Sequence, residues 1–357
     1  MIRASEPDSR APAPGDPDAI TAEQRALEHD AQHVADELPE APLPRRGRRI
    51  RRWIKWGVAA VVLFFVGRAL WQQLAEASSQ SVAFRWPWAI AATVTLVGLY
   101  GSLMASERSL LIAFSGVRLP WRRMMAIAWV PLAGKYIPGK FAAVAGAVAL
   151  LRRAGISTAT GLSIFVILDA MPILTGSMLS GLLLFDDGVR ATVNRRFPVA
   201  WLLLAGVIVV GLVCIHPAVF RRLTTFALRL LRRPPLPRVP ELRDYLSPAL
   251  WSLGQWAGNA GAMFLMCVAF SPAGRAPGLE DLPTVIGITA IVMCVSYFSA
   301  FLTPGGLGVR EGLLLPLLAT VVPLPAAAAV TVAMRLAHTV VEIILCGIGL
   351  ILLRRHP

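Results

Sequence analysis

The sequence predicts an all-α fold, that of a polytopic helical membrane protein, and its composition is the first observation that predicts it. Of the 357 residues, 56% are hydrophobic and only 16% are charged, and the mean hydropathy is +0.62. A soluble domain carries about 25% charged residues. The second observation is a series of apolar runs near the ~20 residues that a spanning helix needs. Together these observations exclude a soluble globular enzyme.

The apolar runs are of two kinds, continuous and broken. Continuous runs predict about six full spans, at about 53–74, 88–105, 156–185, 199–218, 247–270 and 325–353. Two further stretches are interrupted by proline and glycine: 124–151 at Pro131, Gly134, Pro138 and Gly139, and 284–322 at Pro304-Gly305-Gly306. Apolar pieces of about 10–14 residues are too short to span. Each broken stretch therefore predicts a re-entrant helix–break–helix hairpin, although the second also fits two short spans.

The first 52 residues differ in character from the rest of the chain. Residues 1–44 contain 3 arginines, 10 acidic residues and no apolar run, which is typical of a disordered segment. A basic juxtamembrane run follows. We therefore expect a disordered acidic tail over 1–52, a transmembrane domain over 53–353 and a short cytoplasmic end over 354–357.

Basic residues are the third observation, because they are spread unevenly between the loops. One set of loops holds 22 Lys and Arg residues: 45–55, 105–123, 152–153, 221–243 and 354–355. The alternate loops hold only five: 75–87, 186–198 and 271–283. Cytoplasmic loops are enriched in Lys and Arg. The pattern predicts a multi-pass protein of the cell (plasma or inner) membrane with both termini in the cytoplasm.

The two broken stretches resemble each other. Gly146 follows Pro138 by eight residues, and Gly312 follows Pro304 by eight. An ionisable residue lies 31 residues beyond each proline, Asp169 in the first case and Arg335 in the second. With the predicted orientation, units at about 122–185 and 284–353 enter from opposite faces. They form an inverted repeat, an arrangement common in secondary transporters, whose sites lie near the midplane.

Ionisable residues inside the apolar stretches are the candidate substrate-binding and translocation residues. There are seven: Lys135, Lys140, Asp169, Arg310, Glu311, Arg335 and Glu342. Each costs about 2.5–3.5 kcal/mol at a helix centre, so that seven unpaired charges would cost roughly 20 kcal/mol. We therefore expect them to pair around a polar cavity. Four positive charges against three negative ones favour an anionic ligand.

Structural ion pairs between helices are the alternative interpretation of these charges. It applies best to Arg335 and Glu342, which lie seven residues apart on one helix with His338 between them. It applies less well to the residues beside the breaks, where half-helix N-termini offer free N–H groups to a phosphate or carboxylate. On the inverted repeat, Asp169 and Arg335 should approach one midplane cavity.

Other motifs indicate neither a cofactor nor a metal. Residues 134–140 have the spacing of a phosphate-binding P-loop, but Phe141 replaces the required Ser or Thr. The four cysteines lie singly in apolar runs, which favours packing roles. Asp186-Asp187 is the one paired carboxylate that a membrane-embedded transferase would use. Gly254-x3-Gly258 predicts close helix packing, and Gln255 and Asn259 should hydrogen-bond between helices. We expect no cofactor, no metal and no nucleic-acid partner.

Two of these motifs resemble a known family. The string Pro304-Gly305-Gly306-Leu307-Gly308-Val309-Arg310-Glu311-Gly312, together with Lys135-Tyr136-Ile137-Pro138-Gly139-Lys140, resembles the lysylphosphatidylglycerol synthase transmembrane family over roughly 53–353. The resemblance implies a flippase-like domain that moves a modified lipid between leaflets. Fused family members also carry a lipid-modifying catalytic domain. This sequence continues for four residues past its last predicted span, so we expect a stand-alone membrane domain without aminoacyl transfer activity.

The function expected is therefore that of a non-catalytic lipid flippase or transporter. Its substrate would be an anionic or phosphate-bearing lipid, phospho- or polyprenyl-linked. The main alternative is a membrane subunit that presents lipid to a separate synthase or glycosyltransferase. A membrane-embedded transferase and a scaffold are further alternatives. Membrane lipids are the expected partners in each case, with a lipid-modifying enzyme as a second partner in the alternative.

The predicted topology is testable by cysteine accessibility in a variant that lacks the four native cysteines. A single cysteine at position 152 or 153 should react only with reagent on the cytoplasmic side, because its loop belongs to the basic set. A single cysteine within 271–283 should react only from the opposite side. Labelling of position 152 from outside would contradict the orientation.

Overall fold

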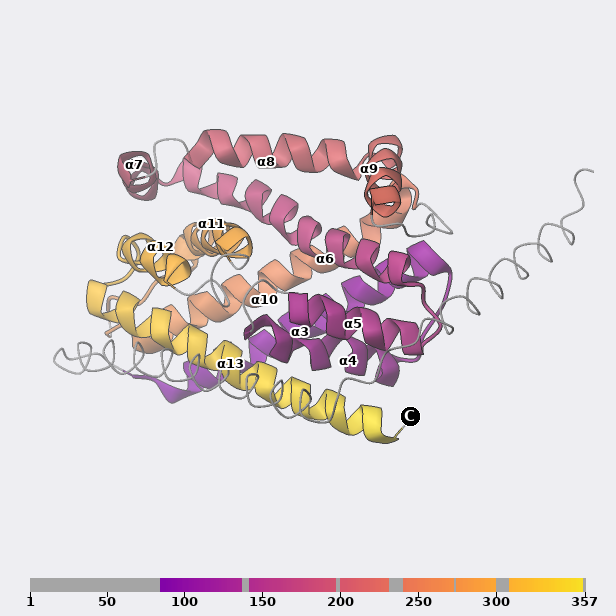
Figure 1. The fold of residues 1–357 in the computed structure, drawn as a ribbon. Coiled ribbons are helices and arrows are strands. Elements are labelled where there is room, and N and C mark those ends of the chain that lie inside the picture. The colour runs from indigo at the N-terminus through magenta and orange to yellow at the C-terminus, as the bar shows by residue number, and fades with distance from the viewer. Residues whose placement is uncertain are drawn as a thin grey trace, which may run out of the picture. The chain divides into compact units, whose positions relative to one another are not determined.

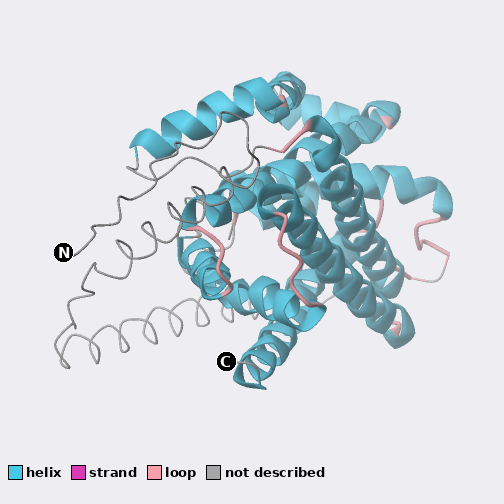
Figure 2. Cartoon of the chain, turned by 90° about the vertical axis from the view of Figure 1, so that its right-hand side faces the viewer, coloured by secondary structure: helices cyan, strands magenta, loops and turns pink. Residues whose placement is uncertain are grey.

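The computed structural model describes residues 84–136, 141–196, 200–230, 240–272, 274–299 and 308–355. In these ranges the chain forms eleven α-helices, α3 to α13, with short 3-10 segments and no strand (Figures 1 and 2). The chain divides into two units, Met1–Gly57 and Val58–Pro357, and the fold below belongs to the second. The predicted tail over 1–52 and the first predicted span over 53–74 lie outside the described residues.

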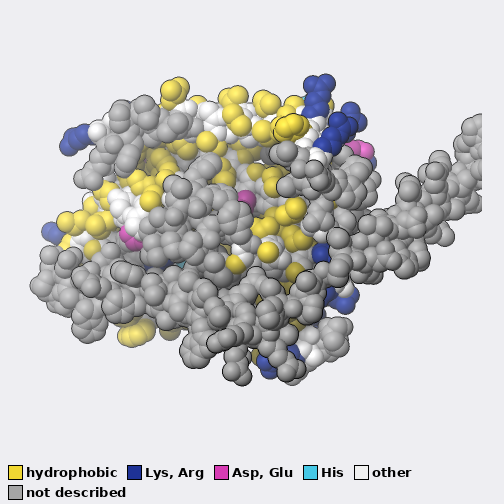
Figure 3. All heavy atoms as spheres, in the orientation of Figure 1, with side chains coloured by type: hydrophobic (Ala, Val, Ile, Leu, Met, Phe, Trp, Pro, Cys, Tyr) yellow, Lys and Arg dark blue, Asp and Glu magenta, His cyan; other side chains and the backbone are white. Residues whose placement is uncertain are grey.

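Five helical segments are long and apolar enough to cross a membrane. They are α3 (Trp86–Ser115), α6 (Thr158–Leu179) with η2 (Ser180–Phe185), η3 (Leu242–Tyr245) with α10 (Leu246–Phe270), η4 (Leu279–Asp281) with α11 (Leu282–Ser299), and α13 (Leu324–Arg355). The all-α, multi-pass class is therefore confirmed. Hydrophobic side chains spread across the face in Figure 3, and basic side chains gather toward its ends.

Helices α3 and α10 pack as an antiparallel pair, because two glycines of α10 let the backbones approach. A methyl group at Gly258 would lie 2.9 Å from Leu99 Cβ and 3.0 Å from the Leu99 backbone, and one at Gly254 would lie 2.9 Å from Ser102 Oγ. At the far end of the pair, Arg85 Nη2 donates to the Val268 carbonyl over 2.6 Å. The close packing predicted from the glycine spacing is confirmed.

Helix α3 is longer than the predicted span of 88–105. It continues to Ser115 and ends at Gly116, whose φ of +70° is the left-handed conformation that favours glycine. The extension is stable because its apolar face continues into the core, where Leu110, Leu111 and Phe114 are fully buried. The loop expected over 105–123 therefore begins at Gly116, eleven residues later than predicted.

Both broken stretches contain a break between two packed helical pieces. The first comprises α4 (Trp121–Trp129), η1 (Val130–Tyr136) and α5 (Phe141–Arg153), and α5 folds so closely on η1 that a methyl group at Gly134 would lie 2.6 Å from the Ala143 nitrogen. In the second, α11 packs against α12 (Val309–Leu318). Residues 137–140 and 300–307 lie outside the described residues. The first arm of the second stretch is longer than expected, since Leu279–Tyr297 has the length of a span.

The predicted span at 199–218 is bent instead of continuous. Helix α8 (Ala200–Ile215) is followed by α9 (Pro217–Leu230), and the axes of Leu204–Cys214 and Ala218–Phe226 differ by 87°. Phe220 of α9 packs on Phe114 with ring centroids 5.9 Å apart. The basic loop expected over 221–243 is therefore helical in its first part, because aromatic packing holds α9 against the bundle.

The α3–α10 contact predicts that one glycine substitution destabilises the protein and that another does not. Gly258→Ala places a methyl group against backbone that cannot move aside, so it should lower the stability of the detergent-solubilised protein by about 1–3 kcal/mol. Gly98→Ala is the matched control on α3, because a methyl group there meets no atom within 4 Å. Thermal unfolding should show a clear drop in Tm for the first variant and none for the second. Equal Tm values would contradict the packing.

Candidate functional site

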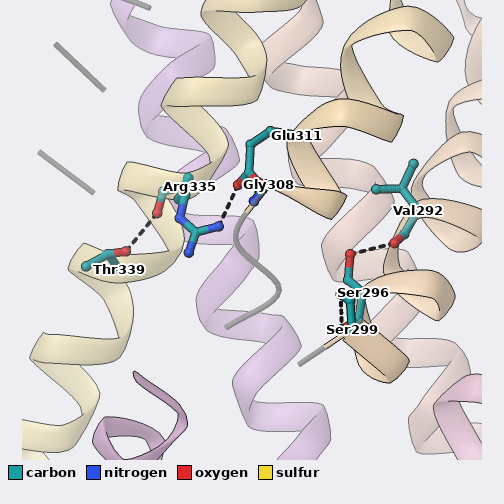
Figure 4. Close-up of polar contacts among 7 residues, drawn as sticks. All are labelled: Val292, Ser296, Ser299, Gly308, Glu311, Arg335 and Thr339. Atoms are coloured by element: carbon teal, nitrogen blue, oxygen red, sulfur yellow. Dashed lines mark hydrogen bonds and ion pairs between the residues drawn. The ribbon is translucent and has the colours of Figure 1, made fainter. Parts of the chain in front are cut away.

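The candidate site is built around the first turn of α12. Gly308 precedes this helix with φ +85°, a left-handed conformation that favours glycine. Its N–H donates to Glu311 Oε2 over 2.8 Å, which satisfies one of the free N–H groups at the helix start. Across the bundle, Arg335 Nη1 donates to Glu311 Oε1 over 2.5 Å (Figure 4). One carboxylate therefore caps α12 and links it to α13.

The local sequence explains this arrangement. A glutamate three residues after the helix N-cap has the reach to accept from the N-cap N–H, as in a capping box. The same position places a negative charge at the positive end of the helix dipole. The glycine and glutamate of the Gly308-Val309-Arg310-Glu311 segment thus shape the chain break, and Arg310 takes no part in the cap.

A second polar group joins α3 to α13. The Tyr100 hydroxyl donates to Glu342 Oε1 and also lies 3.2 Å from His338 Nδ1. All three residues are buried, with exposures of 4%, 2% and 8% for Tyr100, Glu342 and His338. His338 and Glu342 are four residues apart on α13, so they lie on one helix face. The histidine expected between Arg335 and Glu342 is therefore part of an interhelical network.

Arg310 has a free donor close to both groups. Its guanidinium interacts electrostatically with Arg335 and Glu311 of the first group and with Tyr100 and Glu342 of the second. Its Nη2 is buried and has no hydrogen-bond partner among the described residues. A buried donor left unpaired costs about 1–3 kcal/mol. Arg310 therefore presents a guanidinium donor that an anionic acceptor would satisfy.

Asp169 reaches the same region through Tyr297. The Tyr297 side chain on α11 is in electrostatic range of both Asp169 on α6 and Arg310 on α12. Arg335 makes its ion pair with Glu311, and the approach of Asp169 and Arg335 to one midplane cavity stays a prediction. Five predicted site residues gather in this region: Asp169, Arg310, Glu311, Arg335 and Glu342. We call these five, with Tyr100, Tyr297 and His338, the charged cluster.

The remaining predicted positions are not placed by the structure. Lys135 belongs to η1, but its side chain is not described. Lys140 and the break residues Pro138, Gly139, Pro304, Gly305 and Gly306 lie outside the described residues. In the described part of the cluster, two arginines stand against three carboxylates. The excess of one positive charge predicted for the seven candidate residues thus depends on Lys135 and Lys140.

Sequence reasoning missed three residues that the structure places in the interior. Tyr100 and Tyr297 carry no charge, so a search for charges inside apolar runs passes over them. Glu107 was assigned to a loop, yet it is 2% exposed on α3 and its Oε1 has no hydrogen-bond partner among the described residues. The extended apolar face of α3 is the signal that would have found it.

Two amide side chains of α10 do not follow the prediction. Gln255 Nε2 and Asn259 Oδ1 are buried without a hydrogen-bond partner in the described part of the chain, although interhelical hydrogen bonds were expected for both residues. Asn259 follows Gly258, which contacts Leu99 next to Tyr100, so it lies at the depth of the charged cluster. Among the described residues, no group of three or more metal-ligating side chains occurs.

Comparison with known proteins agrees with the motif at the start of α12. The chain matches the family model of the lysylphosphatidylglycerol synthase TM region over residues 52–346. No curated protein matches it. The matched range covers most of the chain and includes every residue of the charged cluster. The chain is a multi-pass membrane protein that belongs to the lysylphosphatidylglycerol synthase transmembrane-region family.

Proposed function

We propose that this protein is a flippase that moves an anionic or phosphate-bearing lipid between the leaflets of the cell membrane. The observation that carries the proposal is the buried Arg310 Nη2, which has no partner among the described side chains. A phosphate oxygen is a suitable acceptor because charge-assisted hydrogen bonds to guanidinium groups are short and strong. The protein acts as a transporter without a catalytic step, and phospholipids and polyprenyl-linked lipids are both candidate substrates.

The position of Arg310 supports transport as the role of this donor. Helix α12 begins at a chain break inside a bundle of span-length helices, and broken helices of this kind form the midplane sites of secondary transporters. We propose that the two broken stretches are re-entrant from opposite faces as an inverted repeat, with both termini in the cytoplasm. The lipid headgroup would then reach Arg310 from either leaflet as the two halves rock.

Reconstitution in liposomes tests the proposed function. Purified protein should accelerate the exchange of fluorescent phosphatidylglycerol between leaflets, and it should act less on phosphatidylcholine, whose headgroup carries no net charge. Arg310→Gln should lower the rate for phosphatidylglycerol about tenfold or more, since a hydrogen bond to a charged group contributes about 1.5–3 kcal/mol. Arg222→Gln is the control, because Arg222 is exposed on α9.

Two results would contradict the proposal. One is an unchanged exchange rate in Arg310→Gln with the wild-type protein active. The other is exchange by the wild-type protein only after a second protein is added, which indicates a subunit that presents lipid to an enzyme.

The Glu311–Arg335 pair predicts a rescue by a second substitution. Breaking a buried ion pair by removing one partner costs about 3–5 kcal/mol, and with side chains 17% and 11% exposed this pair should fall toward the lower end. Glu311→Gln and Arg335→Gln should each lower the Tm. The double variant should recover part of the loss, because the amide that replaces the Glu311 carboxylate keeps an oxygen for the Gly308 N–H and no unpaired charge is left. Strictly additive losses would show that the two side chains act independently.

A further inference from the structure

A cavity outside the charged cluster lies between α7 (Asp187–Arg196), α12 and the first turn of α13. Its volume is about 440 Å³, within the range of about 300–1,000 Å³ that is typical of small-molecule sites. In Figure 1, α7 and α12 lie toward the same end of the view, where α13 begins. The cavity is therefore toward one end of these helices, and neither Tyr100 nor Glu342 lines it.

The two walls of this cavity differ in chemistry. The α12 wall consists of Gly312, Leu315, Pro316 and Ala319, which share one helix face by their spacing. This face is distinct from the one that Leu314, Leu317 and Leu318 bury in the core. The α7 wall carries Thr192 and Arg195. An apolar surface thus faces a cation across the cavity.

Helix α7 is held firmly enough to fix the position of that cation. Val189 and Val193 are fully buried in the core. Asp186 Oδ1 accepts from the Val189 N–H over 2.9 Å at the start of the helix, and its Oδ2 accepts from Thr284 Oγ1 of α11 over 2.9 Å. Asp186, considered above as half of a catalytic carboxylate pair, thus caps and anchors α7.

The charge of Arg195 has no counterpart in the described residues. Arg190, on the same helix, makes an ion pair with Asp187 over 2.6 Å. Arg195 is exposed and has neither an ion pair nor a hydrogen bond with any described residue. The Thr192 hydroxyl donates to the Gly188 carbonyl over 2.9 Å, so its proton is already used. Arg195 is therefore the donor on this wall.

The segment 186–198 is more basic than the other loops of its set. The three loops with few basic residues hold five in all, and three of these lie in 186–198. Basic residues on the side opposite the cytoplasm run against the orientation rule. Arg190 is paired with Asp187, whereas a local anionic ligand would account for the charge of Arg195.

We propose that this cavity binds one anionic phospholipid of the leaflet at the α7 end of the bundle. The lipid phosphate contacts the Arg195 guanidinium, and the first part of its hydrocarbon chain lies on Leu315, Pro316 and Ala319. The complementarity of charge on one wall and apolar surface on the other selects a lipid over free phosphate. The site concerns binding and does not depend on the transport proposed for Arg310.

Lipid retention by the full-length protein tests the proposal. The protein is reconstituted in phosphatidylcholine vesicles that contain a minor fraction of phosphatidylglycerol, extracted in mild detergent and analysed by native mass spectrometry. Arg195→Gln should weaken phosphatidylglycerol retention about tenfold through loss of the charged donor. Gly312→Leu should lower retention at least as much as Arg195→Gln by filling the cavity, and a side chain fits there because a methyl group at Gly312 meets no atom within 4 Å.

Two control variants separate this site from the rest of the molecule. Arg190→Gln removes a cation of α7 outside the cavity and should retain phosphatidylglycerol like the wild type. Arg222→Gln removes an exposed cation of α9, outside both proposed lipid sites, and should retain it as well. Tm measurements establish that each variant is folded.

Three outcomes would overturn the proposal. If the wild type, Arg195→Gln and Gly312→Leu retain phosphatidylglycerol equally, the lipid binds elsewhere. If Arg190→Gln and Arg195→Gln lose it equally, Arg195 has no specific role. If the wild type retains phosphatidylcholine in proportion to its abundance, the site does not select an anionic headgroup.

Discussion

The Glu311 carboxylate supports the part of the bundle on which the candidate site depends. A helix that begins inside an apolar bundle exposes N–H groups that water cannot satisfy. Glu311 accepts from the Gly308 N–H with one oxygen and from Arg335 with the other. The break therefore persists without a free backbone group at Gly308, and the first turn of α12 is tied to α13. The neighbouring Arg310 takes no part in this arrangement, and its Nη2 has no hydrogen-bond partner among the described residues.

The adjacent residues Arg310 and Glu311 thus differ in role, since Glu311 holds α12 in place and Arg310 is the proposed ligand contact. Glu311 and Arg335 form an ion pair that supports α12, whereas Arg310 interacts electrostatically with Tyr100, Glu342 and Tyr297. A site assembled from several helices is sensitive to their relative position. Any motion of α12 against α13 would change the surroundings of Arg310 together with its access to a lipid.

The cavity between α7, α12 and α13 also involves helix α12. Helix α12 has one face toward α13 and the core, and another toward the cavity that Arg195 borders. A lipid on the second face and a headgroup at Arg310 would contact a single short helix. Residues of α12 thus contribute to both proposed sites.

Much of this architecture is predictable from the sequence, because length and hydropathy alone identify spanning helices. The spans at 88–105, 156–185, 247–270 and 325–353, the breaks and the interior charges all follow from that pattern. The bend between α8 and α9 does not, since it depends on Phe220 packing against Phe114 from a distant helix. The ion-pair partner of Arg335 is also set by tertiary structure. Asp169 and Arg335 lie 31 residues beyond the prolines of the two broken stretches, which suggested that they approach each other. In the structure Arg335 pairs with Glu311, which lies in the first turn of α12.

The central claim is that Arg310 holds its free donor for an anionic lipid headgroup. A high-resolution cryo-electron microscopy structure of the protein in phosphatidylglycerol nanodiscs tests it most directly. The account predicts a lipid phosphate within hydrogen-bond distance of Arg310 Nη2, with Glu311 still paired to Arg335. A structure in which Arg310 Nη2 is bonded to a carboxylate of the protein, with no lipid beside α12, would contradict it.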